Sequence, residues 1–213
     1  MQETHTKPTL RIRQSEIADA GRLAYIQETV FPSLAPEERM QAEHFAFHVG
    51  LFPEGQWVVL ADDIVVASTS SIRYTFDPAH PVAHRFAEVF DSGYMRSHDP
   101  NGNWLYGMDM AVLPEYRGLG IARLLYRERQ HVVRQLGLDG QMTVGMLNGY
   151  LTSGYSSVRD YFDAVKRGEV SDPTVSVQLR MGFRILALIE EYLSDPTCGN
   201  AGVLMAMPAD AIV

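Results

Sequence analysis

Apolar and polar residues along the chain follow two periods, and the change of period outlines the expected secondary structure. Alternation with a period of two predicts strands, whereas apolar residues three and four positions apart predict helices. The expected strands cover residues 9–14, 56–61, 64–74, 104–112, 141–147, 183–193 and 203–207. The expected helices cover residues 15–30, 36–49, 120–136, 157–167 and 173–182, with one further short helix inside the long loop 76–102.

The order of these elements predicts a single α/β (α+β) domain. A pair of helices follows the first strand, a hairpin turns at Asp62 and Asp63, and one long helix separates the fourth and fifth strands. This order favours a mixed, mostly antiparallel central sheet of six to seven strands flanked by helices. With 213 residues in the chain, we expect one domain at residues 9–208 between flexible termini at 1–8 and 209–213.

The composition indicates a soluble protein that binds neither nucleic acid nor a membrane. A hydrophobic content of 46% with 21% charged residues is typical of globular domains. The net charge of −8 argues against nucleic acid, which requires a basic surface. No apolar stretch approaches the ~20 residues of a membrane helix, and the first residues lack a signal-peptide pattern. Since the single Cys198 excludes an internal disulfide, we expect a reducing, cytoplasmic location.

One strand-to-helix turn carries the clearest chemical signal. Residues 110–122 read Met-Ala-Val-Leu-Pro-Glu-Tyr-Arg-Gly-Leu-Gly-Ile-Ala, so Gly118 and Gly120 separate a buried strand from a helix. Glycine allows positive φ and a close approach of backbone to ligand, and the first turn of a helix presents free N–H groups with partial positive charge. Together with Arg117, the turn predicts a cradle for a pyrophosphate. The alternative is a glycine-softened turn that holds no ligand.

Two other phosphate-binding motifs do not fit this turn. A dinucleotide-binding fingerprint requires a third glycine where this chain has Arg123, and a βαβ unit that opens the domain. A P-loop requires Gly-Lys-Ser/Thr, which the turn lacks.

The motifs around this turn resemble those of the GNAT acetyltransferase superfamily. Arg117-x-x-Gly120-x-Ala122, after a strand that ends Ala111-Val112, is similar to its motif A, and the expected order of elements matches its fold. The segment Gln178-Leu-Arg-Met-Gly-Phe is similar to its later helix-then-Gly-Phe signature. A closer similarity, to the acetyltransferase domain fused to carbon–nitrogen hydrolases in some bacterial proteins, is carried by residues 105–110, 160–169 and 172–183.

The resemblance implies an enzyme that binds acetyl-CoA as co-substrate and passes the acetyl group to a primary amine of a small molecule or peptide. The residues implied to contact the pantetheine arm and thioester through their backbone are Met110, Ala111 and Val112. The residues implied to wrap the pyrophosphate are Arg117, Gly118, Leu119, Gly120, Ile121 and Ala122. An aimed backbone N–H stabilises the charge that develops on the thioester oxygen. A homodimer is a frequent state in this superfamily.

An amine attacks only in its neutral form, so a general base is expected. Asp109 is the first candidate, because burial inside an apolar strand raises a carboxyl pKa; the alternative is a structural carboxylate that caps a helix or pairs with an arginine. Strict alternation places Asp109 with Gly107 and Ala111, unless a bulge changes the parity. Glu190 and its neighbour Glu191 are the second candidates, with a solvated strand end as the alternative.

The thiolate that leaves has no familiar acid beside it. Many GNAT enzymes carry a tyrosine four residues before the glycine of Gly-Phe, where this chain has Gln178. A thiol with a pKa near ~8.5 can leave as thiolate without help. Otherwise Tyr155, or its neighbours Tyr150 and Tyr161 in the segment 148–170, is the candidate, with packing or a substrate wall as the alternative.

Other functions stay open at this point. The chain fits a CoA-binding sensor or partner module without catalysis, and it fits an acyltransferase that uses another acyl-CoA or a hydroxyl acceptor. No metal is expected, because His44 and His48 share a helix face at metal-binding spacing but lack both the H-E-x-x-H pattern and a third ligand.

Overall fold

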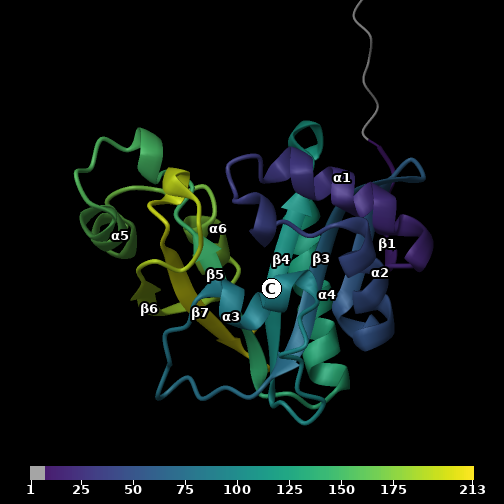
Figure 1. The fold of residues 1–213 in the computed structure, drawn as a ribbon. Helices are drawn as coiled ribbons and strands as arrows, with labels where there is room; N and C mark the ends of the chain where they lie inside the picture. Colours follow the sequence, from purple (N-terminus) through teal and green to yellow (C-terminus); the bar gives the residue numbers. More distant parts are fainter. Residues whose placement is uncertain (1–7) are drawn as a thin grey trace, which may run out of the picture.

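One seven-stranded sheet forms the centre of the computed structural model, which describes residues 8–213 (Figure 1). The strand order is β1-β2-β3-β4-β5-β7-β6, and every neighbouring pair is antiparallel except β4 with β5. The strands are β1 Leu10–Gln14, β2 Gln56–Ala61, β3 Ile64–Tyr74, β4 Trp104–Val112, β5 Gly140–Met146, β6 Arg184–Ile189 and β7 Gly202–Pro208. The expected mixed, mostly antiparallel sheet is therefore confirmed.

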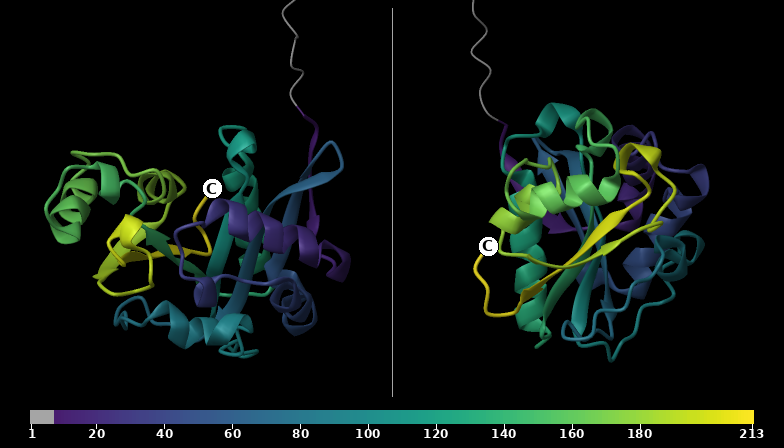
Figure 2. Two further views of the ribbon diagram at one scale, coloured as in Figure 1. Left: turned by 45° about the horizontal axis from the view of Figure 1, so that its top comes forward. Right: turned by 90° about the vertical axis from the view of Figure 1, so that its left-hand side faces the viewer.

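Helices cover both faces of this sheet. The helices are α1 Ala20–Val30, α2 Ala42–Leu51, α3 Phe86–Phe90, α4 Ile121–Gln135, α5 Val158–Lys166 and α6 Val175–Arg180. Helix α1 packs on β3 and β4 and against α2, and α4 packs on the opposite face of the same strands (Figures 1 and 2). Within residues 8–213, no helix is both long and apolar enough to span a membrane.

The long helix α4 explains why β4 and β5 run parallel, since a crossover on one face returns the chain in the same direction. These two strands pair only from Trp104 to Gly107 on β4 and from Gly140 to Thr143 on β5. Beyond Gly107, β4 remains paired with β3 alone, while β5 continues along β7. The outer half of β4 consequently has one side without a neighbouring strand.

A β-bulge interrupts β4 at the same point. Ser71 pairs with Gly107 and Ser70 pairs with Asp109, which leaves Met108 as the extra residue. Gly107 faces α4, because a Cβ there would lie 2.0 Å from an Arg129 nitrogen. Asp109 therefore leaves the face that strict alternation assigns to it, and its side chain turns toward Gln27 of α1. The bulge changes the parity of the strand, which the sequence pattern left open.

Arg129 of α4 heads the largest fully buried side chains, with 2% of its surface exposed. It fills the space beneath the bulge. Its guanidinium donates to the carbonyl oxygen of Asp109 at 2.5 Å. A buried cation requires such partners, because an unpaired one is costly to remove from water. Arg129 thereby holds the bulged backbone in place.

Three expected element boundaries are wrong. The first helix begins at Ala20, after a separate 3-10 turn at Ile17–Asp19. The second begins at Ala42 rather than at residue 36, because the 3-10 turn Pro36–Glu38 ends in an extended residue that breaks the helix. The strand expected at 183–193 ends at Ile189, since the chain turns at Glu190 and Glu191.

Flexible termini were expected at residues 1–8 and 209–213. Residues 1–7 of the expected flexible N-terminus lie outside the described residues. At the other end, Gln130 and Arg134 of α4 donate hydrogen bonds to the carbonyl oxygens of Ala209 and Ala211. The final segment therefore runs along α4.

We predict that Gly107→Ala destabilises the protein by about 1–3 kcal/mol, because the added methyl group collides with the Arg129 guanidinium. Gly21→Ala is the matched control: nothing lies within 4 Å of the added atom, and alanine favours a helix over glycine. Urea unfolding of both variants measures the difference. Equal stabilities of the two variants would show that the bulge adapts freely.

Candidate functional site

The turn between β4 and α4 presents a row of unpaired backbone N–H groups. Gly118 and Gly120 both have positive φ, at 79° and 83°, and the helix starts at Ile121. The amide of Arg117 bonds to Pro114, and the next bonded amide is that of Leu124, which reaches back to Gly120. Among the described residues, the N–H groups of residues 118 to 123 donate no hydrogen bond. Six consecutive free amides at the start of a fifteen-residue helix form an electropositive cradle.

The Arg117 side chain ties the turn to β4 through one of its nitrogens. Its side-chain Nε donates to the carbonyl oxygen of Val112 at 3.2 Å, which ties the turn to the end of β4. The residue is exposed, and its remaining guanidinium nitrogens have no partner among the described residues. They are free to meet an anion in the cradle.

The outer half of β4 adds two further amides. The Leu113 N–H bonds to Val66 of the neighbouring chain segment, and hydrogen-bonded pairs alternate along an antiparallel ladder. By this alternation Ala111 bonds to β3, whereas Met110 and Val112 direct their N–H and C=O groups away from it. Because β5 has already diverged, these groups face the opening between the two strands.

Asp109 is a buried carboxylate at the edge of this opening. The residue is 8% exposed, and its Oδ2 has no hydrogen-bond partner among the described residues. Burial raises the pKa of Asp109 to about 7, against the opposing effects of the Arg129 guanidinium, the Gln27 side chain and the Met110 backbone N–H. A carboxyl group that titrates near neutrality can take up and release a proton under physiological conditions.

The other two carboxylate candidates lie in a different setting. Glu190 follows β6 and accepts two hydrogen bonds from Arg159 of α5, the shorter at 2.6 Å, with 53% of its side chain exposed. Glu191 forms an exposed ion pair with Arg85. Both agree with the solvated strand end that was the alternative to a role as base.

Tyr155 lies in the segment between β5 and α5, which stands apart from β4 in the left view of Figure 2. The side chain is half-buried, and its ring packs against that of Tyr161 at 5.7 Å between centroids. Tyr161 in turn donates to Asp172, which also accepts the Gly149 N–H. These contacts fit the packing alternative for Tyr155.

Sequence reasoning missed Tyr126 of α4. Its hydroxyl accepts a hydrogen bond from the Gln178 side chain at 3.0 Å, and both residues are buried. Tyr126 belongs to the buried stripe of α4 with Ile121, Leu125 and Val132, which is why the apolar periodicity assigns it to the core. The one sign in the sequence was Gln178, at a position where a tyrosine was expected, and it did not point to Tyr126.

The loop before β4 docks on the α1 face through a chain of hydrogen bonds. His84 Nε2 lies 2.8 Å from the Tyr106 hydroxyl, which lies 3.0 Å from that of Tyr192. Burial lowers the pKa of His84, so the ring is neutral at physiological pH and accepts from Tyr106. His80, in the same loop, is exposed in a contact with Asp77.

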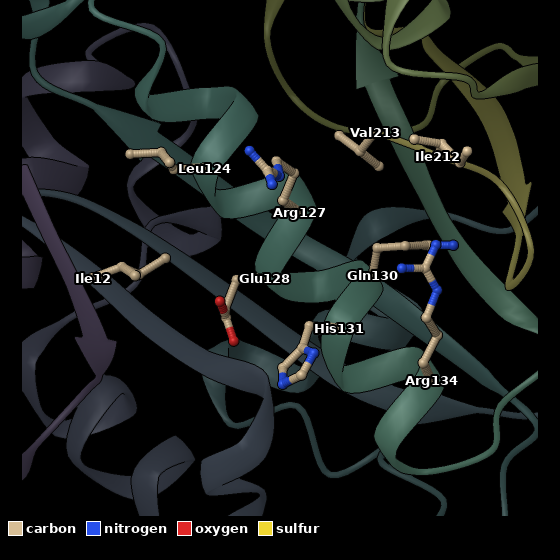
Figure 3. A pocket seen from close by; sticks show the side chains of 9 residues that line it. All are labelled: Ile12, Leu124, Arg127, Glu128, Gln130, His131, Arg134, Ile212 and Val213. Carbon is tan, nitrogen blue, oxygen red and sulfur yellow. The ribbon is translucent and has the colours of Figure 1, made fainter.

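A hollow of about 560 Å³ lies elsewhere, on the flank of α4 between β1 and the end of the chain (Figure 3). Its lining residues are Ile12, Leu124, Arg127, Glu128, Gln130, His131, Arg134, Ile212 and Val213. It contains neither Asp109 nor a residue of the amide cradle. In the part of the chain that the structure describes, no three His, Cys, Asp or Glu side chains come together as metal ligands.

Residues 22–150 match the family model described as "Acetyltransferase (GNAT) family". The chain is 32% identical over 198 residues to the "Uncharacterized N-acetyltransferase YkwB" of Bacillus subtilis, covering 92% of this chain and 87% of that protein. It is 31% identical over 195 residues to the "Probable hydrolase YhcX" of the same organism, covering 91% of this chain but 37% of that longer protein. The expected similarity to a domain of larger hydrolase proteins is confirmed.

Solved structures share the fold at low sequence identity. The "GphF GNAT-like decarboxylase in complex with isobutyryl-CoA" has a TM-score of 0.77 at 24% identity, covering 93% of this chain and 99% of that one. The loading GNATL domain of CurA from Lyngbya majuscula has a TM-score of 0.78 at 18% identity, with 94% and 98% covered. The putative acetyltransferase yncA of Salmonella typhimurium, solved with acetyl-CoA, has a TM-score of 0.56 at 13% identity, with 94% of each chain covered.

The raised pKa of Asp109 predicts a loss of stability with rising pH. A carboxyl that titrates at 3.8 when unfolded and at about 7 when folded binds an extra proton only in the folded state between these values. The stability that this proton contributes is fully present below about pH 4 and is lost as the pH rises to about 7. Asp109→Asn has no charge to bury. We expect the difference in free energy of unfolding between this variant and the wild type to shift in the variant's favour by up to about 4 kcal/mol from pH 4 to pH 8.

Thermal melts of both proteins at the two pH values measure this gain. Asp210→Asn removes a carboxyl group at an exposed position and serves as the control. A constant difference between Asp109→Asn and the wild type at pH 4 and pH 8 would mean that Asp109 titrates normally.

Proposed function

The chain belongs to the acetyltransferase (GNAT) family, and on that premise we propose that it transfers the acetyl group of acetyl-CoA to a primary amine by direct attack within a ternary complex. The proposed acceptor is a small molecule or the amino group of a peptide. The observation that carries the proposal is the coincidence of a six-amide anion cradle, an unpaired strand edge and a buried carboxyl group of neutral pKa.

The free amides of residues 118 to 123 fit a diphosphate group, because they supply a row of N–H donors at the positive end of a helix. We assign the pyrophosphate of CoA to this cradle and the extended pantetheine arm to the edge of β4 beside Met110 and Val112. Acetyl-CoA would supply the thioester. The protein would hold the thioester against the opening between β4 and β5, close to a bound acceptor.

Two groups of β4 then act on the reacting centre. Asp109, with a pKa of about 7, accepts the proton that the ammonium form of the acceptor must lose. The backbone N–H of Val112 on the unpaired edge stabilises negative charge on the thioester oxygen, because that of Met110 already bonds to the Asp109 carboxyl. Asp109 lies on the α1 face and the cradle opens the α4 helix on the other, so base and CoA approach from opposite faces of the sheet.

Calorimetry with acetyl-CoA followed by a thiol-release assay over a panel of amines tests the proposal as a whole. We expect binding and turnover on at least one amine. Tight binding without turnover on any acceptor would instead indicate a CoA-binding sensor or partner module. Turnover restricted to hydroxyl acceptors, or to acyl groups other than acetyl, would indicate a different acyltransferase.

We predict that Asp109→Asn lowers kcat by about 10²–10⁴-fold at pH 7, and that activity recovers as the pH approaches the pKa of the amine. The recovery follows because an amine that is already neutral needs no base. The pH–rate profile is the measurement. Glu190→Gln is the control, since this exposed carboxylate is paired with Arg159 and should leave the profile unchanged. A profile shared by Asp109→Asn and the wild type would remove Asp109 as the base.

We predict that Gly120→Val weakens acetyl-CoA binding by at least about tenfold. A β-branched residue resists the positive φ of 83°, so the first turn of α4 shifts and the row of amides is misaligned. Gly137→Val is the matched control, because Gly137 at the far end of the same helix also has positive φ, at 63°. Calorimetry compares the two; equal affinities would place the diphosphate elsewhere.

A further inference from the structure

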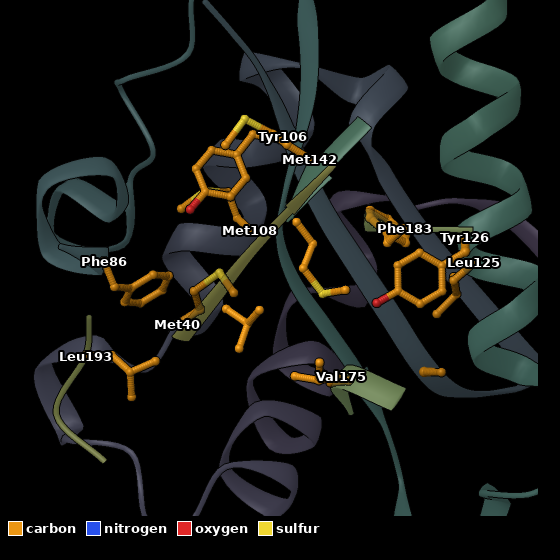
Figure 4. Packing of buried hydrophobic residues seen from close by; sticks show 14 of the residues in the cluster. Met40, Phe86, Tyr106, Met108, Leu125, Tyr126, Met142, Val175, Phe183 and Leu193 are labelled. Carbon is orange, nitrogen blue, oxygen red and sulfur yellow. The ribbon is translucent and has the colours of Figure 1, made fainter. Parts of the chain in front are cut away.

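Tyr126 and Gln178 form a buried polar pair, and Figure 4 shows Tyr126 among the apolar side chains of the core. Tyr126 is 5% exposed and Gln178 is 4% exposed. The Tyr126 ring extends from α4 toward Phe183, with 5.3 Å between ring centroids. The glutamine Nε2 donates to the tyrosine hydroxyl at 3.0 Å, so the hydroxyl is the acceptor in this contact.

This arrangement leaves the Tyr126 hydroxyl proton without an acceptor. Among the described residues, the hydroxyl makes no bond other than the one it accepts from Gln178. The Gln178 Oε1 also has no partner. An unsatisfied donor in a buried position is costly, and proteins retain such groups where a ligand completes the bond.

The position of the pair points to the ligand. Gln178 Oε1 lies against Gly145, where an added Cβ would come within 2.1 Å of it. Gly145 belongs to the part of β5 beyond Thr143, the last residue that pairs with β4. Tyr126 lies six residues after Gly120, roughly 9 Å along the helix axis. The hydroxyl thus meets, through Gln178, the part of β5 that has left β4, on the helix that begins with the amide cradle.

We propose that the Tyr126 hydroxyl, oriented by Gln178, donates a hydrogen bond to the sulfur atom of bound CoA and stabilises the thiolate that leaves. This inference rests on the proposed function, because it requires CoA in the cradle. Tyr126 is then a catalytic residue that touches the co-substrate, and Gln178 is a positioning residue that acts through it.

The chemistry requires stabilisation of sulfur at one step. Asp109 has by then taken the first proton from the ammonium form of the acceptor. As the C–N bond forms and the C–S bond breaks, the bonding electron pair stays on sulfur, and the second proton leaves the nitrogen for water. Tyr126 offers its O–H to the sulfur during this step, and the free thiolate later takes its proton from water. Burial raises the pKa of Tyr126, against the Arg129 guanidinium and the Gln178 contact, so the hydroxyl keeps its proton. A donor that stays protonated suits a hydrogen bond rather than full proton transfer.

The ultraviolet absorbance of the thiolate, followed against pH in the complex with CoA itself, tests the inference without any acceptor. A hydrogen bond to sulfur favours the charged form and lowers the thiol pKa. We expect the bound thiol of the wild type to titrate below free CoA, and Tyr126→Phe to raise this pKa by about one unit, a tenfold smaller thiolate fraction at a given pH. Tyr25→Phe, at a 51% exposed tyrosine of α1, is the matched control and should behave as the wild type.

Gln178→Leu keeps the tyrosine but removes the group that orients it, so an intermediate thiol pKa is expected. Calorimetry on the same samples shows that each variant is folded and binds CoA. Unchanged thiol pKa in Tyr126→Phe with CoA bound would overturn this inference and leave the proposed function standing. Absence of CoA binding by the wild type would overturn both.

Discussion

The parting of β4 from β5 is the constraint on which the rest of the site depends. The two strands run parallel because α4 crosses between them, and they pair over only four residues on each strand before they separate. The bulge at Met108 falls where the pairing ends, and the buried Arg129 guanidinium holds it by bonding to the Asp109 carbonyl oxygen. One helix therefore sets the opening, fixes the bulge beside it and begins with the free amides.

The bulge also decides which face of the sheet carries the base. Gly107 looks toward α4 and Asp109 toward α1, although only one residue separates them. The α4 face supplies hydrogen-bond donors, and the α1 face supplies a carboxyl group in a dry setting. Choice of acceptor would then depend on α1, α2 and the loop that His84 and Tyr106 anchor, while the handling of CoA stays with α4.

The fold and the cradle follow from local sequence patterns. Strand and helix periods gave the element order, and two glycines after a buried strand gave the turn, because both signals lie within a few neighbouring residues. The face of the sheet on which the Asp109 side chain lies could not be predicted, because the bulge depends on the register with β3, which is distant in the sequence. Glu190 was a candidate because the strand seemed to continue, whereas the turn at Glu191, with φ of 55°, exposes it. Tyr126 was hidden for the opposite reason: a side chain on an apolar stripe gives no sign that a distant glutamine meets its hydroxyl.

The anion cradle has a further consequence for how the protein can change over time. Its donors are main-chain groups, which every amino acid other than proline possesses. The half-buried side chains of Leu119 and Ala122 can therefore be exchanged for others with the cradle intact, as long as the chain keeps its two left-handed glycines and the core packing of Ile121. The shape of the anion cradle is thus encoded in backbone torsion angles, and divergent sequences can keep it with few identical residues.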